Sequence, residues 1–299
     1  PGVGPVVTPR AEAAPERVPT ALDPLPVPVV DNHTHLDITR DGTEVSVEAL
    51  GPVLAAAADV GVDRLVQIGC DLPGARFAVA AAEHHAGVLA GVALHPNEVP
   101  GLAATGELTA AYAEIERLAA HPRVRVVGES GLDYFRTGPD GVPVQQESFR
   151  WHIDLAKRLG KALQVHDRDS HDDVVRILDE EGAPPATVMH CFSGGPELAR
   201  QCVERGYHLS FSGTVTFKNA TALRDALAVT PLDLLLVETD APYLTPHPWR
   251  GATNSPALVP LTVRVMAGVL GVAVPTLCEA LSDNAERLYG PWSAPFAAP

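Results

Sequence analysis

The chain has 299 residues, 46% hydrophobic and 20% charged, which is enough apolar material for one large domain or two ordinary ones. A net charge of −15 disfavours non-specific wrapping of a nucleic-acid duplex. Bound cations and a few local arginines can still make the electrostatic potential positive at one binding site. The four cysteines form no C-x-x-C pair, so free thiols in a cytoplasmic, reducing compartment are expected. The apolar runs are too short for a transmembrane helix, and no membrane association is expected.

Composition divides the chain into three parts. Residues 1–26 are rich in proline and alanine without a continuous apolar run, which predicts a flexible or loosely packed amino-terminal extension. Residues 27–290 alternate between extended and helical patterns without a visible boundary, which predicts one domain. Residues 291–299 are left as a short carboxy-terminal tail.

Short apolar runs typical of buried strands recur along the domain, and they are expected at 27–32, 64–69, 88–94, 123–127, 162–165, 187–189, 207–211 and 234–237. Helices are expected between and after them, at about 49–58, 73–85, 107–119, 145–159, 170–181, 196–204, 220–228, 255–270 and 275–288. Ser46 and Ser170 are the expected caps of two of these helices.

Eight short strands, each followed by a helix, predict an α/β fold of the TIM (β/α)8 barrel type. An open, doubly wound sheet is the competing fold. That sheet is typically marked by a glycine-rich loop after the first strand, where this chain has His33-Thr34-His35 instead.

Possible metal ligands follow six of the eight expected strands. In a parallel barrel the carboxyl ends of all strands meet at one rim, where functional side chains gather. His33 and His35 lie two residues apart, so they project the same way from the end of the first strand. The strand ends carry these residues: His33, His35, His95, Glu129, His166, His190, Glu238 and Asp240. Histidine and carboxylate side chains are ligands of divalent cations, so the rim is a candidate metal site.

Some of these residues have other readings. His95 is compatible with a substrate contact or with packing, and Asp240 could cap the turn that follows it. Glu238 is compatible with a structural or supporting role, and Asp133 and Tyr134 are expected to support Glu129.

Six motifs together resemble those of the TatD-type metal-dependent deoxyribonucleases, a family of amidohydrolase-like barrels. They are DNHTHLD (31–37), GESGLDY (128–134), VHDRDS (165–170), HCFSG (190–194), SFSGTVTF (210–217) and ETDAPYL (238–244). The likeness runs in order from about residue 29 to 289. Two departures are visible: the third-strand motif reads Gly-Val-Ala-Leu-His-Pro, where the family usually has Gly-Val-His-Pro, and Ser130 stands where threonine is commoner.

The resemblance implies a site with two divalent metal cations, Mg, Mn or Zn. His33, His35 and Asp240 would hold one cation, His166 and His190 the other, and Glu129 would bridge them. Asp240 would also act as the catalytic base on a water that attacks a phosphodiester.

The implied substrate is DNA, single-stranded or at 3′ ends, and no obligate protein partner is implied. Arg168, Lys218 and Arg250, with His95, are the candidate substrate contacts. A terminal base could stack on an aromatic side chain, with Tyr134, Phe135, Phe192, Tyr243 and Trp249 as candidates. The alternative is an amidohydrolase or esterase acting on a small substrate or on mischarged aminoacyl-tRNA.

Overall fold

The computed structural model describes residues 22–292, and the ends of the predicted extension and tail, 1–21 and 293–299, lie outside the described residues. One sheet of eight parallel strands runs in sequence order from β1 to β8. The strands are β1 Val29–Thr34, β2 Val62–Gly69, β3 Val88–Val92, β4 Val124–Asp133, β5 Ala162–Arg168, β6 Thr187–Met189, β7 His208–Phe211 and β8 Leu235–Val237.

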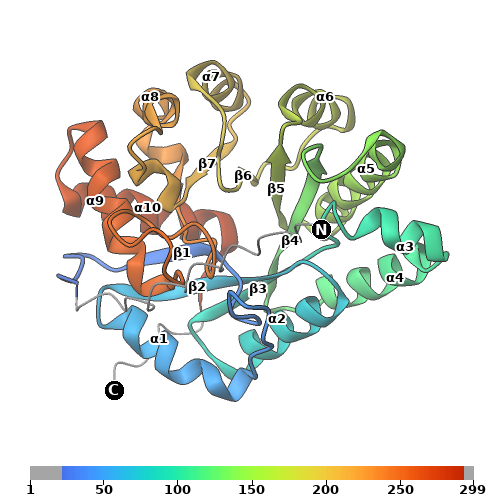
Figure 1. Ribbon diagram of the computed structural model, residues 1–299, viewed down its shortest axis with the longest axis horizontal. Coiled ribbons are helices and arrows are strands. Elements are labelled where there is room, and N and C mark those ends of the chain that lie inside the picture. Colours follow the sequence, from blue (N-terminus) through green and yellow to red (C-terminus); the bar gives the residue numbers. More distant parts are fainter. Residues whose placement is uncertain (1–21, 293–299) are drawn as a thin grey trace, which may run out of the picture.

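Helices follow the strands and lie outside the sheet, with α10 beside β1 and α9 next to α10 (Figure 1). They are α1 Gly51–Ala58, α2 Leu72–His84, α3 Val99–Thr105, α4 Leu108–Ala119, α5 Val142–Leu159, α6 His171–Glu181, α7 Pro196–Glu204, α8 Thr221–Val229, α9 Val259–Leu270 and α10 Val274–Tyr289. Five short 3-10 turns are η1 Val47–Leu50, η2 Pro139–Gly141, η3 Gly213–Thr216, η4 Leu232–Leu234 and η5 Pro256–Leu258.

The sheet closes on itself where β8 and its following loop meet β1. The Asn32 side-chain amide donates to the Val237 carbonyl at 3.1 Å. Beyond β8, the Asp240 N–H donates to the His33 carbonyl at 3.0 Å and the His35 N–H to the Ala241 carbonyl at 2.8 Å. The predicted TIM barrel is therefore confirmed, and these bonds join the first and last strand ends at the rim.

The core lies between the strands and the surrounding helices, and its aliphatic side chains are fully buried. Val62, Leu65, Val88 and Leu209 on the strands and Ile153 on α5 are each 0% exposed. Burying such side chains stabilises the fold by about 1.5–3 kcal/mol each. Within residues 22–292 no single helix is long and apolar enough to cross a membrane, and the pair 256–270 and 274–289 passes that test only together, bent by 111°.

Several local predictions were incomplete or wrong. Strand β4 extends to Asp133 because Ser130 to Asp133 pair with β5, and α3 was missed altogether. Neither serine caps through its side chain. The Ser170 hydroxyl instead lies within hydrogen-bond distance of two acceptors, the Leu132 carbonyl at 3.0 Å and Asp167 Oδ1 at 2.9 Å, so it connects the ends of β4 and β5. The four cysteines are free, as predicted.

Candidate metal centre

The predicted ligands come together at the carboxyl-terminal rim of the barrel. His33 and His35 arrive on β1 and the residue after it, Glu129 on β4 and His166 on β5. His190 directly follows β6, and Asp240 lies three residues after β8. Their donor atoms form overlapping groups in which all atoms lie within 4.8 Å of one another, and one of these groups is His33, His35 and Asp240.

Glu129 lies between two sets of histidines and turns one oxygen toward each. Its Oε1 lies 3.5 Å from His33 Nε2 and 3.4 Å from His35 Nε2. Its Oε2 lies 2.9 Å from His166 Nδ1 and 2.8 Å from His190 Nε2. The carboxylate is only 5% exposed, so both oxygens are committed to the site.

Three of the four histidines have a hydrogen-bond partner at the ring nitrogen that faces away from the site, and the fourth, His166, has Asp133 nearby without a hydrogen bond to its Nε2. His33 Nδ1 lies 2.7 Å from Gln164 Oε1, and His35 Nδ1 lies 3.0 Å from the Ile68 carbonyl. His190 Nδ1 lies 3.3 Å from Glu238 Oε1, and Asp133 Oδ2 lies 3.4 Å from His166 Nε2. Metal-binding histidines almost always carry such a partner, because it fixes the tautomer and the ring orientation.

The donor set fits a divalent cation. When Nδ1 of His33 and of His35 each donate to an oxygen, the two Nε2 atoms are unprotonated acceptors. These two atoms are only 3.2 Å apart, and Asp240 Oδ1 lies 3.3 Å from the Nε2 of His35. Burial alone would lower the pKa of His35, but Cys70, Asp240 and Glu129 raise it well above its ordinary value, so a proton separates these acceptor atoms in the metal-free site. A cation there would replace that proton and satisfy the acceptor atoms together.

Crowded charges shift the pKa values in the site. Burial alone would lower the pKa of His190, but the carboxylates of Glu129 and Glu238 outweigh burial and raise that pKa well above its ordinary value. Burial alone would raise the pKa of Glu129, and the surrounding histidines instead hold it well below the usual range. Asp240 shifts in the same direction, because His35 outweighs its burial. The carboxylates of Glu129 and Asp240 are therefore held ionised, and their negative charge would attract a cation.

The first residue of the DNHTHLD motif anchors the turn that carries Asp240. Asp31 is fully buried, and its carboxylate accepts from the Thr239 N–H at 2.9 Å and from the Thr239 hydroxyl at 2.6 Å. Asp240 follows with φ of 56°, in the left-handed region that aspartate enters more readily than most residues. Asp31 therefore fixes the turn that aims the Asp240 carboxylate at His33 and His35.

Two supporting groups were missed in the sequence, and a third was expected to have a supporting role. Cys70, the residue after β2, lies with Sγ 3.2 Å from Glu129 Oε1, and its strand end had not been considered. Gln164 was hidden inside an apolar strand pattern. Glu238, expected in a structural or supporting role, lies fully buried behind His190.

The predicted support of Glu129 by Asp133 and Tyr134 is wrong in detail. Asp133 lies beside His166, and its carboxylate accepts from the Asn97 amide at 2.9 Å. The Tyr134 hydroxyl donates to Asp173 on α6 at 2.7 Å. Both residues hold the end of β4 in place and leave Glu129 to the histidines.

His95 lies inside the cluster, with Nε2 3.8 Å from Glu129 Oε2 and its ring centroid 4.5 Å from that of His166. Burial lowers the pKa of His95 to about 3, so the ring is neutral. Arg168, Lys218 and Arg250 are exposed on the loops and strand ends around the same rim. The guanidinium carbons of Arg168 and Arg250 each lie 4.2 Å from a phenylalanine ring centroid, those of Phe135 and Phe217 respectively.

Comparison with known proteins matches this chain to one family. Residues 30–290 match the family described as TatD related DNase. The chain is 46% identical over 266 residues to "Uncharacterized metal-dependent hydrolase TatD" of Mycobacterium tuberculosis, covering 88% of this chain and 98% of that protein. It is 37% identical over 260 residues to the metal-dependent hydrolase YabD of Bacillus subtilis, covering 87% and 98%.

A solved structure agrees with the barrel described above. The crystal structure of YJJV, a TatD homologue of Escherichia coli, superposes with a TM-score of 0.79 at 27% identity. The superposition covers 88% of this chain and 98% of that one.

Proposed function

The chain belongs to the TatD family of metal-dependent hydrolases, and from this premise we propose that it is a deoxyribonuclease that cleaves phosphodiester bonds in DNA. The observation that carries the proposal is the placement of Glu129, with one carboxylate oxygen toward His33 and His35 and the other toward His166 and His190. Two ions sharing one carboxylate are the arrangement found in many phosphate-ester hydrolases.

In the proposed site His33, His35 and Asp240 would hold one divalent cation, His166 and His190 would hold a second, and Glu129 would be shared between them. Such cations, when bound, acidify a water and stabilise the negative charge that grows on a phosphoryl oxygen. Imidazole and carboxylate ligands suit Zn, Mn or Mg.

Asp240 is the proposed general base. Its side chain is 16% exposed, more than that of Glu129, so it is the cage carboxylate that water can reach. Its lowered pKa keeps it deprotonated at neutral pH and able to take a proton from the attacking water. The bonds from Asp31 to Thr239 hold its backbone in place while it does so.

The rim favours a phosphate substrate over a small neutral one. In a chain of net charge −15, Arg168, Lys218 and Arg250 all lie exposed around the mouth. Guanidinium groups bind phosphate oxygens in pairs, so a nucleic-acid strand can be held against the negative charge of the protein.

The test is hydrolysis of end-labelled single-stranded DNA by the purified protein with Mg or Mn. We expect stepwise shortening that EDTA stops and that Asp240→Ala abolishes, whereas Asp225→Ala, an exposed carboxylate on α8, leaves the rate unchanged. Aminoacyl-tRNA and small lactones are run beside the DNA. Rapid metal-dependent hydrolysis of either one, with DNA left intact, would overturn the nuclease proposal in favour of esterase activity.

A further inference from the structure

Exposed aromatic surface is concentrated at the mouth of the barrel. Among residues 22–292, the large hydrophobic side chains that remain exposed are Phe135 at 63% and Tyr243 at 45%. Phe135 follows β4, and Tyr243 follows β8, three residues after Asp240. Strands β4 and β8 stand opposite each other in an eight-stranded barrel, so the two rings flank the metal centre.

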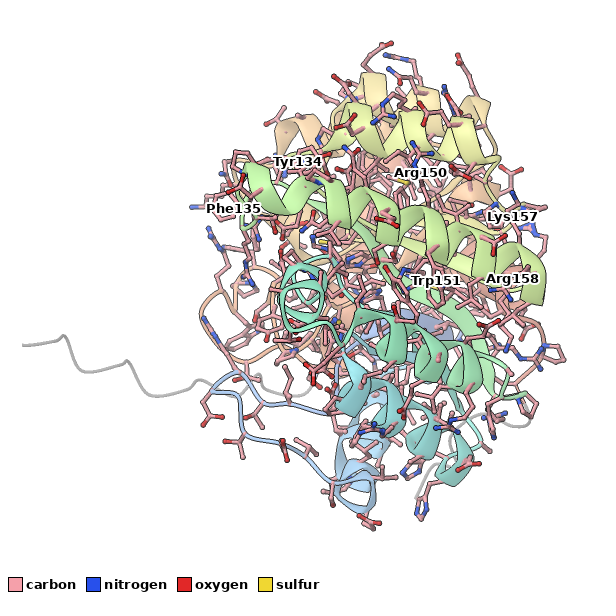
Figure 2. The ribbon with its side chains drawn as sticks, turned by 90° about the vertical axis from the view of Figure 1, so that its right-hand side faces the viewer. Tyr134, Phe135, Arg150, Trp151, Lys157 and Arg158 are labelled. Carbon is pink, nitrogen blue, oxygen red and sulfur yellow. The ribbon has the colours of Figure 1, made fainter. Side chains whose placement is uncertain are left out.

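Phe135 is held by its neighbours and presents its ring to solvent. The Tyr134 N–H donates to the Arg168 carbonyl at 2.9 Å, which joins the loop after β4 to the end of β5. The Tyr134 hydroxyl is fixed by Asp173 and by the Gln146 amide, each at 2.7 Å. Figure 2 shows Tyr134 and Phe135 together at the amino-terminal end of α5, with Phe135 at the edge of the molecule.

The guanidinium group of Arg168 lies against the Phe135 ring, close to the metal centre. The Arg168 guanidinium carbon is 4.2 Å from the Phe135 centroid. Arg168 is two residues after His166 and pairs in register with Asp133, whose carboxylate touches His166. Two residues of extended chain span about 7 Å, so the pair lies roughly one nucleotide beyond the proposed cations.

A hollow of about 380 Å³ adjoins the pair. It is lined by Arg136, the residue after Phe135, and by Asn97 and Pro100 across from it. The Arg136 backbone N–H donates to Asp133 Oδ1 at 2.9 Å. This hydrogen bond ties the Arg136 side of the hollow to Asp133, which lies beside His166. Arg136 is exposed and is the cationic residue of the lining, which also includes the carboxylate residue Asp140.

We propose that the β4–α5 loop binds one nucleotide of an unpaired strand, with the base stacked on Phe135 beside Arg168 and the adjoining phosphate held by Arg136. This rests on the proposed nuclease function and adds a reason for strand preference. Every base has a flat face that stacks on an aromatic ring, but in a duplex both faces are covered by neighbouring bases. The loop therefore favours single strands and frayed ends without reading their sequence.

The experiment separates the base contact from the phosphate contact. Binding of a fluorescent single-stranded oligonucleotide, and of the same oligonucleotide with abasic nucleotides at its 3′ end, is measured by anisotropy in EDTA, where hydrolysis is off. Phe135→Leu is expected to weaken binding of the normal strand roughly tenfold, the order expected for one lost base stack, and to leave abasic binding unchanged. Arg136→Ala is expected to weaken both and to lower the salt slope by about 1.

Two control variants show whether a change in binding comes from the lost stacking face or from an unrelated surface residue. Phe135→Tyr keeps a stacking face and should restore normal binding, and Arg117→Ala, an exposed arginine on α4, should change nothing. In Mn, Phe135→Leu should raise KM more than it lowers kcat. The stacking role is overturned if the wild type binds normal and abasic strands equally, or if Phe135→Leu binds the normal strand as tightly as the wild type does. When DNA hydrolysis continues in such a case, the nuclease proposal still stands. If the wild type neither binds nor cleaves any oligonucleotide, the nuclease proposal fails as well.

Discussion

Replacing Glu238 with glutamine tests whether the groups behind the histidines tune the metal centre. Glu238 is fully buried, and its Oε1 lies 3.3 Å from His190 Nδ1, on the side of the ring opposite Glu129. Losing such a partner typically weakens metal binding 10- to 100-fold, which is about 1.4–2.7 kcal/mol. Glutamine keeps the shape and one acceptor oxygen, so Glu238→Gln should fall near the tenfold end.

The same substitution should not destabilise the metal-free protein. The second oxygen of Glu238 is buried without a hydrogen-bond partner, and a buried carboxylate is costly to keep charged. Removing the charge should therefore leave the thermal unfolding temperature of the metal-free protein unchanged or higher, while metal affinity falls. A misfolded variant would instead lose both together.

Metal affinity is measured by titrating Mn or Zn into EDTA-dialysed protein in competition with a fluorescent chelator. Thermal unfolding of the same metal-free sample supplies the second readout. Glu279→Gln, an exposed glutamate on α10, is the matched control and should behave as the wild type does. An affinity for metal that is unchanged in Glu238→Gln would refute the reasoning, because His190 would then need no partner to bind.

Two further predictions concern a thiol and a buried ring. Cys70→Ala removes the S–H group that lies 3.2 Å from Glu129 Oε1, and it should weaken metal binding several-fold in the same titration. Cys70→Ser keeps a donor and should bind metal nearly as the wild type does. Equal metal affinities of the wild type and both variants would contradict this prediction. Burial lowers the pKa of His152 to about 4, and its neutral ring accepts from the Leu94 N–H at 3.1 Å and donates to the Ser148 carbonyl at 2.8 Å. His152 takes up a proton near pH 6.5 in the unfolded chain but only near pH 4 in the native protein. About 3 kcal/mol of the free energy of unfolding, present above pH 6.5, should therefore be lost as the pH falls from 6.5 to 4. Urea unfolding at several pH values should show a flatter profile for His152→Gln, and parallel profiles would exclude this role.

The barrel was predictable because its strands are short apolar runs and its helices fill the intervals. The errors occurred where tertiary pairing overrides local pattern. The polar, glycine-containing stretch 128–133 does not look like a strand, yet it pairs with β5 as far as Asp133 and Arg168. Helix α3 begins at Val99-Pro100-Gly101, residues that typically mark a loop, so only the fold itself reveals it.

The convergence of the candidate metal ligands was predictable for a different reason. Parallel topology places the carboxyl ends of all eight strands at one rim, so the ligands can be found by reading the residue after each apolar run. Their partners cannot be found in this way. Gln164 lies within a strand and reaches His33 across the barrel, and the link from Asp31 to Thr239 spans 208 residues. Such contacts follow from barrel closure, which no local pattern records.

Anomalous diffraction from crystals of this protein soaked in Mn tests the central claim most directly. The account predicts two peaks at the rim, one among His33, His35 and Asp240 and the other between His166 and His190, with Glu129 in contact with both. A map with no peak at these residues, from crystals in which Mn is bound elsewhere, would contradict it.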